Sequence, residues 1–187
     1  IVGFIQTAMV FVAIPFIKPL VKKFGKKETA SAGMLLASIA YFTLYLLQGL
    51  PLPMFFGLLS VGMFGFAFFN LVIWAFVTDV IDYHEFLTDM REDATVYAVY
   101  SFARKVGQAI AGGLGGFAIA AVGYSAGAAT QSQGVLDGIY MLGTLVPAIF
   151  FLVVFLLLVF VYPLNKKRVL ELANNLEVKR NAKLQND

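Results

Sequence analysis

The chain has 187 residues, of which 60% are hydrophobic and only 13% are charged, and its mean hydropathy is +0.82. Soluble domains are about 45–50% apolar and about 25% charged, so this composition excludes an ordinary soluble domain and predicts an all-α membrane protein. The sequence contains no cysteine, which excludes disulfides and thiolate metal sites. It opens with "IVGFIQTAMVF", which we interpret as a start inside a helix of a longer protein rather than as a signal peptide.

Runs without charged residues predict the membrane-spanning helices. The longest such run covers residues 29–78, and the segment "GLPLP" at 49–53 divides it, since its two prolines favour a turn. Each half is long enough to cross a hydrocarbon core of about 30 Å. We therefore predict a bundle over 1–165 and a basic tail over 166–187, in which "VLELANNLEVK" favours a short amphipathic helix. The five predicted spans lie near 1–20, 29–48, 54–77, 95–122 and 138–162.

The cations are divided unevenly between the predicted connections. Five lie where the first two helices meet, one between the third and fourth helices, and six in the tail, whereas the connections at 49–53 and 123–137 hold none. The positive-inside rule therefore predicts a multi-pass protein of the cell membrane with a cytoplasmic C-terminus. The twelve are Lys18, Lys22, Lys23, Lys26, Lys27, Arg91, Lys166, Lys167, Arg168, Lys179, Arg180 and Lys183.

The third predicted helix carries Asn70, Trp74 and Thr78 at intervals of four residues, so they share one face. Trp74 is the only tryptophan of the chain. It is interpretable as an aromatic residue of the membrane interface. Alternatively, it is a platform on which a sugar ring stacks, with Asn70 beside it to bond the hydroxyl groups. The sequence leaves both readings open.

The segment "TDVIDYHEFLTDMRED" at 78–93 places Asp79, Asp82 and Glu85 three residues apart, which is one face if the third helix continues. Acids at a helix C-terminus are unfavourable by about 0.3–1 kcal/mol each when exposed, so a basic partner is expected. The available partners are Arg91, Arg104 and the pair Lys22/Lys23, and we predict that Arg104 pairs with Asp79 or Asp82. The alternative is a solvated charged loop, and the single histidine, His84, is read as a surface residue.

Two adjacent cations, Arg104 and Lys105, lie about ten residues inside the fourth helix, or ~15 Å at 1.5 Å per residue. A Lys or Arg at the centre of a span is unfavourable by at least about 2.5–3.5 kcal/mol. Such residues normally face the bundle interior or a water-filled path. This predicts a functional role for both cations. The alternatives are a structural ion pair or a helix that extends further into the cytoplasm.

Helical spacing places Tyr97, Ser101, Lys105 and Gln108 on one face, together with Gly112. A phenol, a hydroxyl, an ammonium and an amide together indicate the lining of a polar, substrate-binding cavity. Hydrogen bonding between helices is the alternative use of Ser and Gln. Gly112 and Gly116 form a G-x-x-x-G motif, whose default meaning is close packing against another helix.

Several of these stretches resemble one transporter family. "DVIDYHEF" and "REDATVYAVYSFARKVGQAIAGGLGGFAIAAVGY" resemble the tenth and eleventh helices, with their connection, of the glycoside–pentoside–hexuronide:cation symporters of the major facilitator superfamily. These are the relatives of the melibiose carrier. "PFIKPLVKKFGKK" is similar to the family's basic loop between helices eight and nine. The resemblance covers residues 1 to about 168, which the family would number as helices eight to twelve, in its C-terminal half.

The resemblance implies a 12-helix fold in which sugar binds between two bundles near the membrane midplane, with symport driven by Na⁺, Li⁺ or H⁺. It places the family's helix-eleven lysine on Lys105. The family's main cation-binding acids lie in its N-terminal half, which is therefore an expected partner that this sequence lacks. The superfamily's basic loop often carries an Asp, which "KKFGKK" does not, so the acid–base latch there is in doubt.

A sugar symporter is thus the leading hypothesis, with lipid and small-molecule sugar as the other partners. A lipid or lysolipid carrier of the same fold is the alternative. An enzyme is not expected, because no cysteine and no paired acids within a span are available. No cofactor beyond the coupling cation and no nucleic acid are expected, since attraction to lipid headgroups accounts for the basic tail.

Overall fold

The computed structural model describes residues 1–186, so Asp187, the last residue of the predicted tail, lies outside it. These residues fold almost entirely into helices, which confirms the all-α prediction. Two features go beyond the predicted spans, since α3 continues to Thr88 and the tail forms one long helix, α6. The elements are α1 (Val2–Phe24), α2 (Lys26–Leu46), α3 (Leu52–Thr88), α4 (Asp93–Ala121), α5 (Gln133–Leu156), a π-helical turn (Leu157–Val161) and α6 (Lys166–Asn186).

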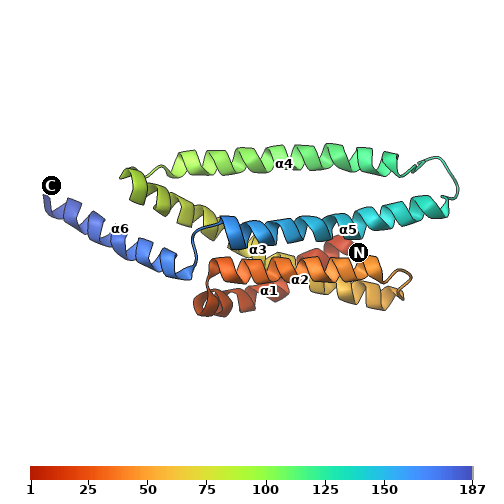
Figure 1. The fold of residues 1–187 in the computed structure, drawn as a ribbon, viewed down its shortest axis with the longest axis horizontal. Helices are drawn as coiled ribbons and strands as arrows, with labels where there is room; N and C mark the ends of the chain where they lie inside the picture. The colour runs from red at the N-terminus through yellow and green to blue at the C-terminus, as the bar shows by residue number, and fades with distance from the viewer. Residues whose placement is uncertain (187) are drawn as a thin grey trace.

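Four of the described helical segments are long and apolar enough to cross a membrane. They are α1, α2, α3 and the continuous segment Gln133–Val161 that joins α5 to the π-helical turn. The fifth predicted span, α4, has 29 residues, which is ample length, but Arg104, Lys105 and its glycines lower its hydropathy. It nevertheless runs alongside the other four helices (Figure 1).

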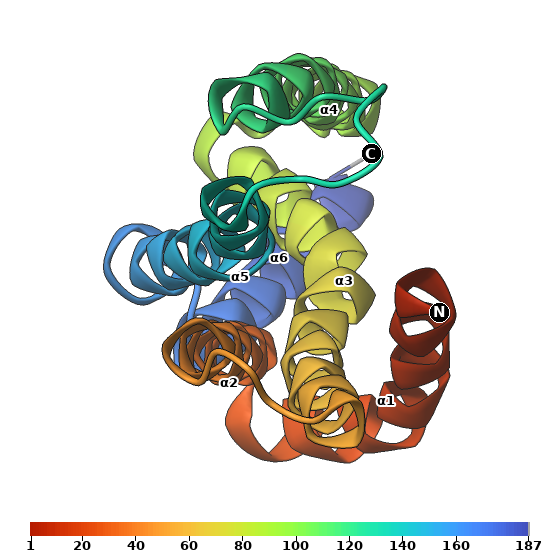
Figure 2. The same ribbon diagram turned by 90° about the vertical axis from the view of Figure 1, so that its right-hand side faces the viewer.

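The chain passes back and forth along the long axis of the molecule, so its connections gather at two ends (Figure 1). The turns from α1 to α2, from α3 to α4 and from α5 to α6 lie at one end, where the cations are concentrated. The turns from α2 to α3 and from α4 to α5 lie at the other end. The end-on view shows α4 set apart from α1 and α2, on the far side of α3 and α5 (Figure 2).

The core lies where α3 and α5 pack against α2. Polar contacts reinforce this packing, since the Ser38 hydroxyl donates to the Ala148 carbonyl at 2.9 Å and the Tyr140 hydroxyl donates to the Leu44 carbonyl at 2.6 Å. Hydrogen bonds between membrane helices commonly use such hydroxyls. By contrast, α4 contains no buried residue. The buried hydrophobic residues include Ala30, Met34, Tyr41, Leu44, Leu59, Met63, Ala67, Phe68, Val72, Phe76, Ala148 and Leu158.

Glycine brings α2 and α3 into backbone contact. A Cβ atom on Gly33 would collide with the carbonyl oxygen of Gly65, and a Cβ atom on Gly65 would collide with the carbonyl oxygen of Gly33. The sequence predicted this role for Gly112 and Gly116 of α4, and that prediction is wrong for the described chain, because nothing lies within 4 Å of a Cβ built on either. The close approach thus belongs to a glycine pair in two helices, which no motif within one helix reveals.

Replacing Gly33 by valine is expected to destabilise the protein by at least 1–3 kcal/mol, the range for overpacked cores, because backbone atoms cannot move aside as a flexible side chain can. Gly112→Val is the matched control, since its site is open. Thermal unfolding in detergent measures both. Equal loss of stability in the two variants would contradict the proposed contact between α2 and α3.

Candidate functional site: a polar cavity and two ion-pair clusters

A polar cavity of about 290 Å³ lies between α3 and α4. Trp74 of α3 contributes an aromatic wall, and its ring meets that of Tyr100 edge-on at 5.2 Å between centroids. Tyr97 extends this wall, with its ring centroid 6.1 Å from that of Trp74. The cavity is lined by Trp74, Tyr100, Ser101, Arg104, Lys105 and Gln108.

Four of the six residues predicted to bind substrate therefore line one cavity: Lys105, Trp74, Ser101 and Gln108. The three from α4 meet there because they are three or four residues apart on one helix. Tyr100 joins them although the sequence reading did not select it. Tyr100 could have been identified as a neighbour of Trp74 only if the packing of α3 against α4 had been known.

The other two predicted substrate residues lie beside this cavity rather than in its lining. Tyr97 touches Trp74. Asn70 is exposed, and its side-chain nitrogen donates to the Phe66 carbonyl of the same helix at 3.3 Å. Asn70 therefore has a local partner, whereas Trp74 contacts Tyr97 and Tyr100 of α4.

Arg104 and Lys105 form no ion pair and no hydrogen bond with any residue that the structure describes. The predicted pairing of Arg104 with Asp79 or Asp82 is therefore wrong for this structure. The reason is that both carboxylates have nearer partners at the end of the bundle, while Arg104 lines the cavity with Lys105.

The first ion-pair cluster is buried. Lys26, at the start of α2, donates to Asp79 Oδ1 at 2.6 Å, and the Asp79 side chain is only 5% exposed, against 29% for Lys26. Asp79 Oδ2 is buried without a hydrogen-bond partner among the described atoms, and so is the hydroxyl of Tyr162. This carboxylate depends on one lysine for its compensation. The basic segment "KKFGKK" thus pairs with an acid on α3, Asp79, although the segment itself contains no Asp.

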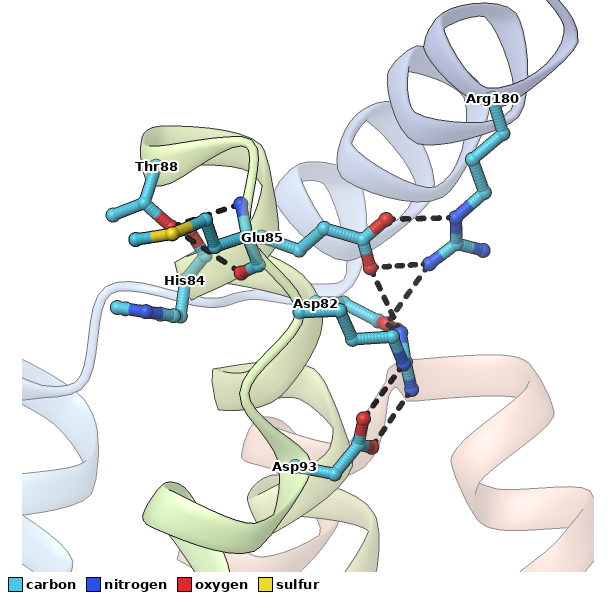
Figure 3. A network of polar contacts seen from close by, with 8 residues as sticks. Asp82, His84, Glu85, Thr88, Asp93 and Arg180 are labelled. Atoms are coloured by element: carbon cyan, nitrogen blue, oxygen red, sulfur yellow. Dashed lines mark hydrogen bonds and ion pairs between the residues drawn. The ribbon is translucent and has the colours of Figure 1, made fainter. Parts of the chain in front are cut away.

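The second cluster, at the end of α3, is more exposed. Arg91 donates to Asp82 and Glu85 at 2.9 Å each and also reaches Asp93 (Figure 3). Arg180 of α6 binds both oxygens of Glu85, at 2.9 and 2.6 Å. The carboxylates raise the pKa of both guanidinium groups: Asp82 and then Glu85 act on Arg91, and Glu85 acts on Arg180. Both arginines therefore stay charged. Arg91 joins the end of α3 to the start of α4, and Arg180 joins α6 to the end of α3.

Arg91 was predicted to compensate the acids, whereas Arg180 was not. Arg180 lies 95 residues from Glu85 in the sequence. The tail was read as a segment for lipid headgroups, and no local pattern signals such a distant partner. Lys179 strengthens the same junction, because its ammonium reaches Asp89 at 3.1 Å and lies over the Phe86 ring.

The comparison with known proteins decides the family. Residues 1–166 match the family described as MFS/sugar transport protein. The chain belongs to this family. It is 32% identical over 182 residues to a putative sulfoquinovose importer of Escherichia coli, which covers 97% of the chain and 38% of that protein. The glycoside symporter type of this superfamily, which the sequence resembled, is thereby confirmed.

Two further relatives agree. The chain is 32% identical over 171 residues to a glucuronide carrier protein homolog of Escherichia coli, covering 91% of the chain and 37% of that protein. It is likewise 32% identical over 177 residues to an uncharacterized symporter of Bacillus subtilis, covering 95% of the chain and 38% of that protein. The chain thus spans well under half the length of these relatives. Its family and its apolar helices together make the chain a multi-pass membrane protein.

A second, larger cavity of about 860 Å³ lies between α3, α4 and the π-helical turn. Its walls are mostly apolar, and His84 and Glu92 stand at its polar edge, with His84 Nε2 3.7 Å from Glu92 Oε2. The His84 side chain is 36% exposed, so it lies at the surface, at the edge of this cavity. The apolar lining suits hydrocarbon rather than sugar.

Proposed function

We propose that the whole protein is a cation-coupled symporter that carries a sugar or glycoside by alternating access. The observation that carries this proposal is the polar cavity beside Trp74, since an aromatic wall with hydroxyl, amide and cationic groups suits the C–H faces and hydroxyl groups of a sugar. Membership of a sugar transport family, and the names of the sulfoquinovose importer and the glucuronide carrier homolog, support the same substrate class.

In this proposal the chain supplies helices eight to twelve, and the cavity is completed by the N-terminal bundle of the whole transporter. The coupling cation, Na⁺, Li⁺ or H⁺, binds acids in that bundle. Lys105 of α4 responds electrostatically to the bound cation. The two clusters that end α3 then act at the cytoplasmic gate, because they join α2, α3 and α6 at a single end of the bundle.

The test uses the full-length transporter in sealed vesicles. Radiolabelled sugars and glycosides are offered with an imposed Na⁺, Li⁺ or proton gradient and without one. We expect accumulation above the external concentration with one of these gradients, and only equilibration without any. Equilibration under all three gradients would contradict coupling, and no uptake of any sugar would contradict the substrate class.

The larger apolar cavity favours a second candidate, a carrier of lipid or lysolipid. A labelled lysolipid in the same vesicles separates the two candidates. Transport of lysolipid that is unaffected by excess sugar would favour the lipid carrier.

The cations at one end of the bundle support a cytoplasmic C-terminus. Because the chain has no native cysteine, single cysteines can report the orientation. In whole cells, an impermeant maleimide is expected to label Leu52→Cys and Ala128→Cys, both exposed at one end, but not Lys22→Cys or Asn181→Cys. Labelling of the Lys22→Cys variant from outside would reverse the proposed topology.

A further inference from the structure

A third cavity lies where the turn from α1 to α2 meets the first turn of α6 (Figure 1). It has a volume of about 250 Å³, and we call it the basic pocket because Lys22, Lys26 and Lys166 line it and no acidic residue does. The Lys166 ammonium fixes the position of α6 here, since it donates to the carbonyl oxygens of Lys22 and Lys23 at 2.9 Å each. Three separate helices thus contribute cations to one small cavity.

Gly25 permits this close approach. It joins α1 to α2 with a φ of 114°, which residues with a side chain rarely adopt. A Cβ atom on Gly25 would also lie only 2.8 Å from the Cβ atom of Lys166. The glycine therefore lets the start of α6 lie directly against the turn.

The charges of the basic pocket are compensated unequally. Lys26 is paired with Asp79, whereas Lys22 and Lys166 form no ion pair with any residue that the structure describes. Glu28, the acid that follows the turn, lines a neighbouring apolar cavity instead. An ammonium group has three N–H donors, so Lys166 retains one donor beyond its two carbonyl acceptors. The pocket therefore offers two positive charges and unused donors to an anion.

The far end of α6 differs from its first turn. Lys179 and Arg180 are bound by acids at the end of α3, Lys179 by Asp89 and Arg180 by Glu85. These cations hold the helix to the bundle and are not available to lipid headgroups in the way that a uniformly solvated basic tail would be. Attraction between α6 and an anionic headgroup is therefore strongest at Lys166.

The basic pocket also lies at the depth where headgroups are expected. Lys22 is in the last turn of α1, a helix that ends at Phe24 and is long and apolar enough to cross a membrane. Phe24 and Leu170 expose apolar surface near the lysines. The volume is below the ~300 Å³ at which pockets for drug-sized ligands begin, so it suits a phosphate diester rather than a whole lipid. Basic pockets between helices are known to take phospholipid headgroups.

We propose that the basic pocket binds the phosphate of an anionic phospholipid, with the ammonium groups of Lys22 and Lys166 on its oxygens. The acyl chains then lie along the exposed apolar side of α1, and the bound lipid joins α6 to the turn between α1 and α2. This proposal does not depend on which substrate the transporter carries. The competing occupant is an acidic side chain from a part of the whole transporter outside this chain, in which case no lipid binds here.

The test uses the purified full-length transporter in a neutral detergent. It is titrated with dioleoyl phosphatidylglycerol, which is anionic, or with dioleoyl phosphatidylcholine, which is zwitterionic, and bound lipid is counted by native mass spectrometry. We expect a saturable phosphatidylglycerol site that binds about fivefold or more tightly than phosphatidylcholine, because each lysine near an anionic headgroup contributes roughly a fivefold factor.

Lys22→Gln is expected to weaken phosphatidylglycerol binding about fivefold and to leave phosphatidylcholine unchanged. The variant keeps the Lys22 carbonyl that Lys166 binds, so the junction with α6 is retained. Lys167→Gln is the matched control, because Lys167 is a highly exposed lysine of the same turn of α6 and does not line the pocket. It should bind both lipids as the wild type does.

Equal affinity for the two lipids would overturn the proposal. An equal loss in Lys22→Gln and Lys167→Gln would replace the pocket by unspecific attraction to the basic surface. An unchanged affinity in Lys22→Gln would place the bound lipid elsewhere. Inorganic phosphate is added as a competitor, and its displacing the lipid at equal concentration would assign the pocket to a soluble anion instead.

Discussion

The Lys105→Leu variant of the full-length transporter is expected to fold but to lose uphill accumulation of substrate almost completely, so that the inside and outside concentrations become about equal. Lys105 lies in the polar cavity and has no ion partner in the described chain. Leucine removes the cost of placing a cation at the centre of a membrane span, about 2.5–3.5 kcal/mol, so stability should equal or exceed that of the wild type. The variant loses the Lys105 ammonium, and with it the proposed coupling between substrate binding and cation binding.

The measurement is uptake into vesicles under an imposed ion gradient, beside sugar exchange without a gradient. Lys105→Arg should rescue only in part, because a planar fork does not replace a compact point charge. Lys167→Leu, at an exposed lysine of α6, is the matched control and should transport normally. Normal uphill uptake by Lys105→Leu would make Lys105 a structural residue.

The second large effect is expected at the buried pair of Lys26 and Asp79. Replacing Lys26 by methionine leaves the Asp79 carboxylate buried and unpaired, and breaking a buried ion pair in this way typically destabilises by about 3–5 kcal/mol. Asp79→Asn should be milder, because the Lys26 side chain is 29% exposed and can turn to water. Thermal unfolding of the purified protein measures both variants.

The double variant, Lys26→Met with Asp79→Asn, should recover most of the stability lost in Lys26→Met alone, because no buried charge remains. Lys167→Met provides the control, since Lys167 is highly exposed and its pair with Glu171 should contribute little. If the two single effects simply add in the double variant, Lys26 and Asp79 do not depend on each other.

The sequence alone was sufficient for features that one helix expresses by itself. Charge-free runs of about 20 residues marked the positions of the long helices, because a hydrocarbon core tolerates few charged side chains. The spacing of Ser101, Lys105 and Gln108 placed them on one face, because an α-helix repeats every 3.6 residues. The uneven distribution of lysine and arginine correctly predicted that three connections lie at the same end of the bundle (Figure 1).

The contacts between helices were decided only by the tertiary structure. Periodicity shows which face of a helix is polar, but not which helix lies opposite. The sequence therefore paired Arg104 with Asp79 or Asp82, whereas packing of α2 on α3 brings Lys26 to Asp79, and Arg91 binds Asp82. Likewise Arg180 reaches Glu85 only because α6 runs past the end of α3.

The same limit applies to close packing. Gly112 and Gly116 carried the local motif, yet Gly33 and Gly65 make the backbone contact, since that contact needs a small residue at the crossing point of both helices. A motif in one sequence segment specifies where a helix could be approached. The position and angle of the neighbouring helix, set by the whole core, determine where it is approached.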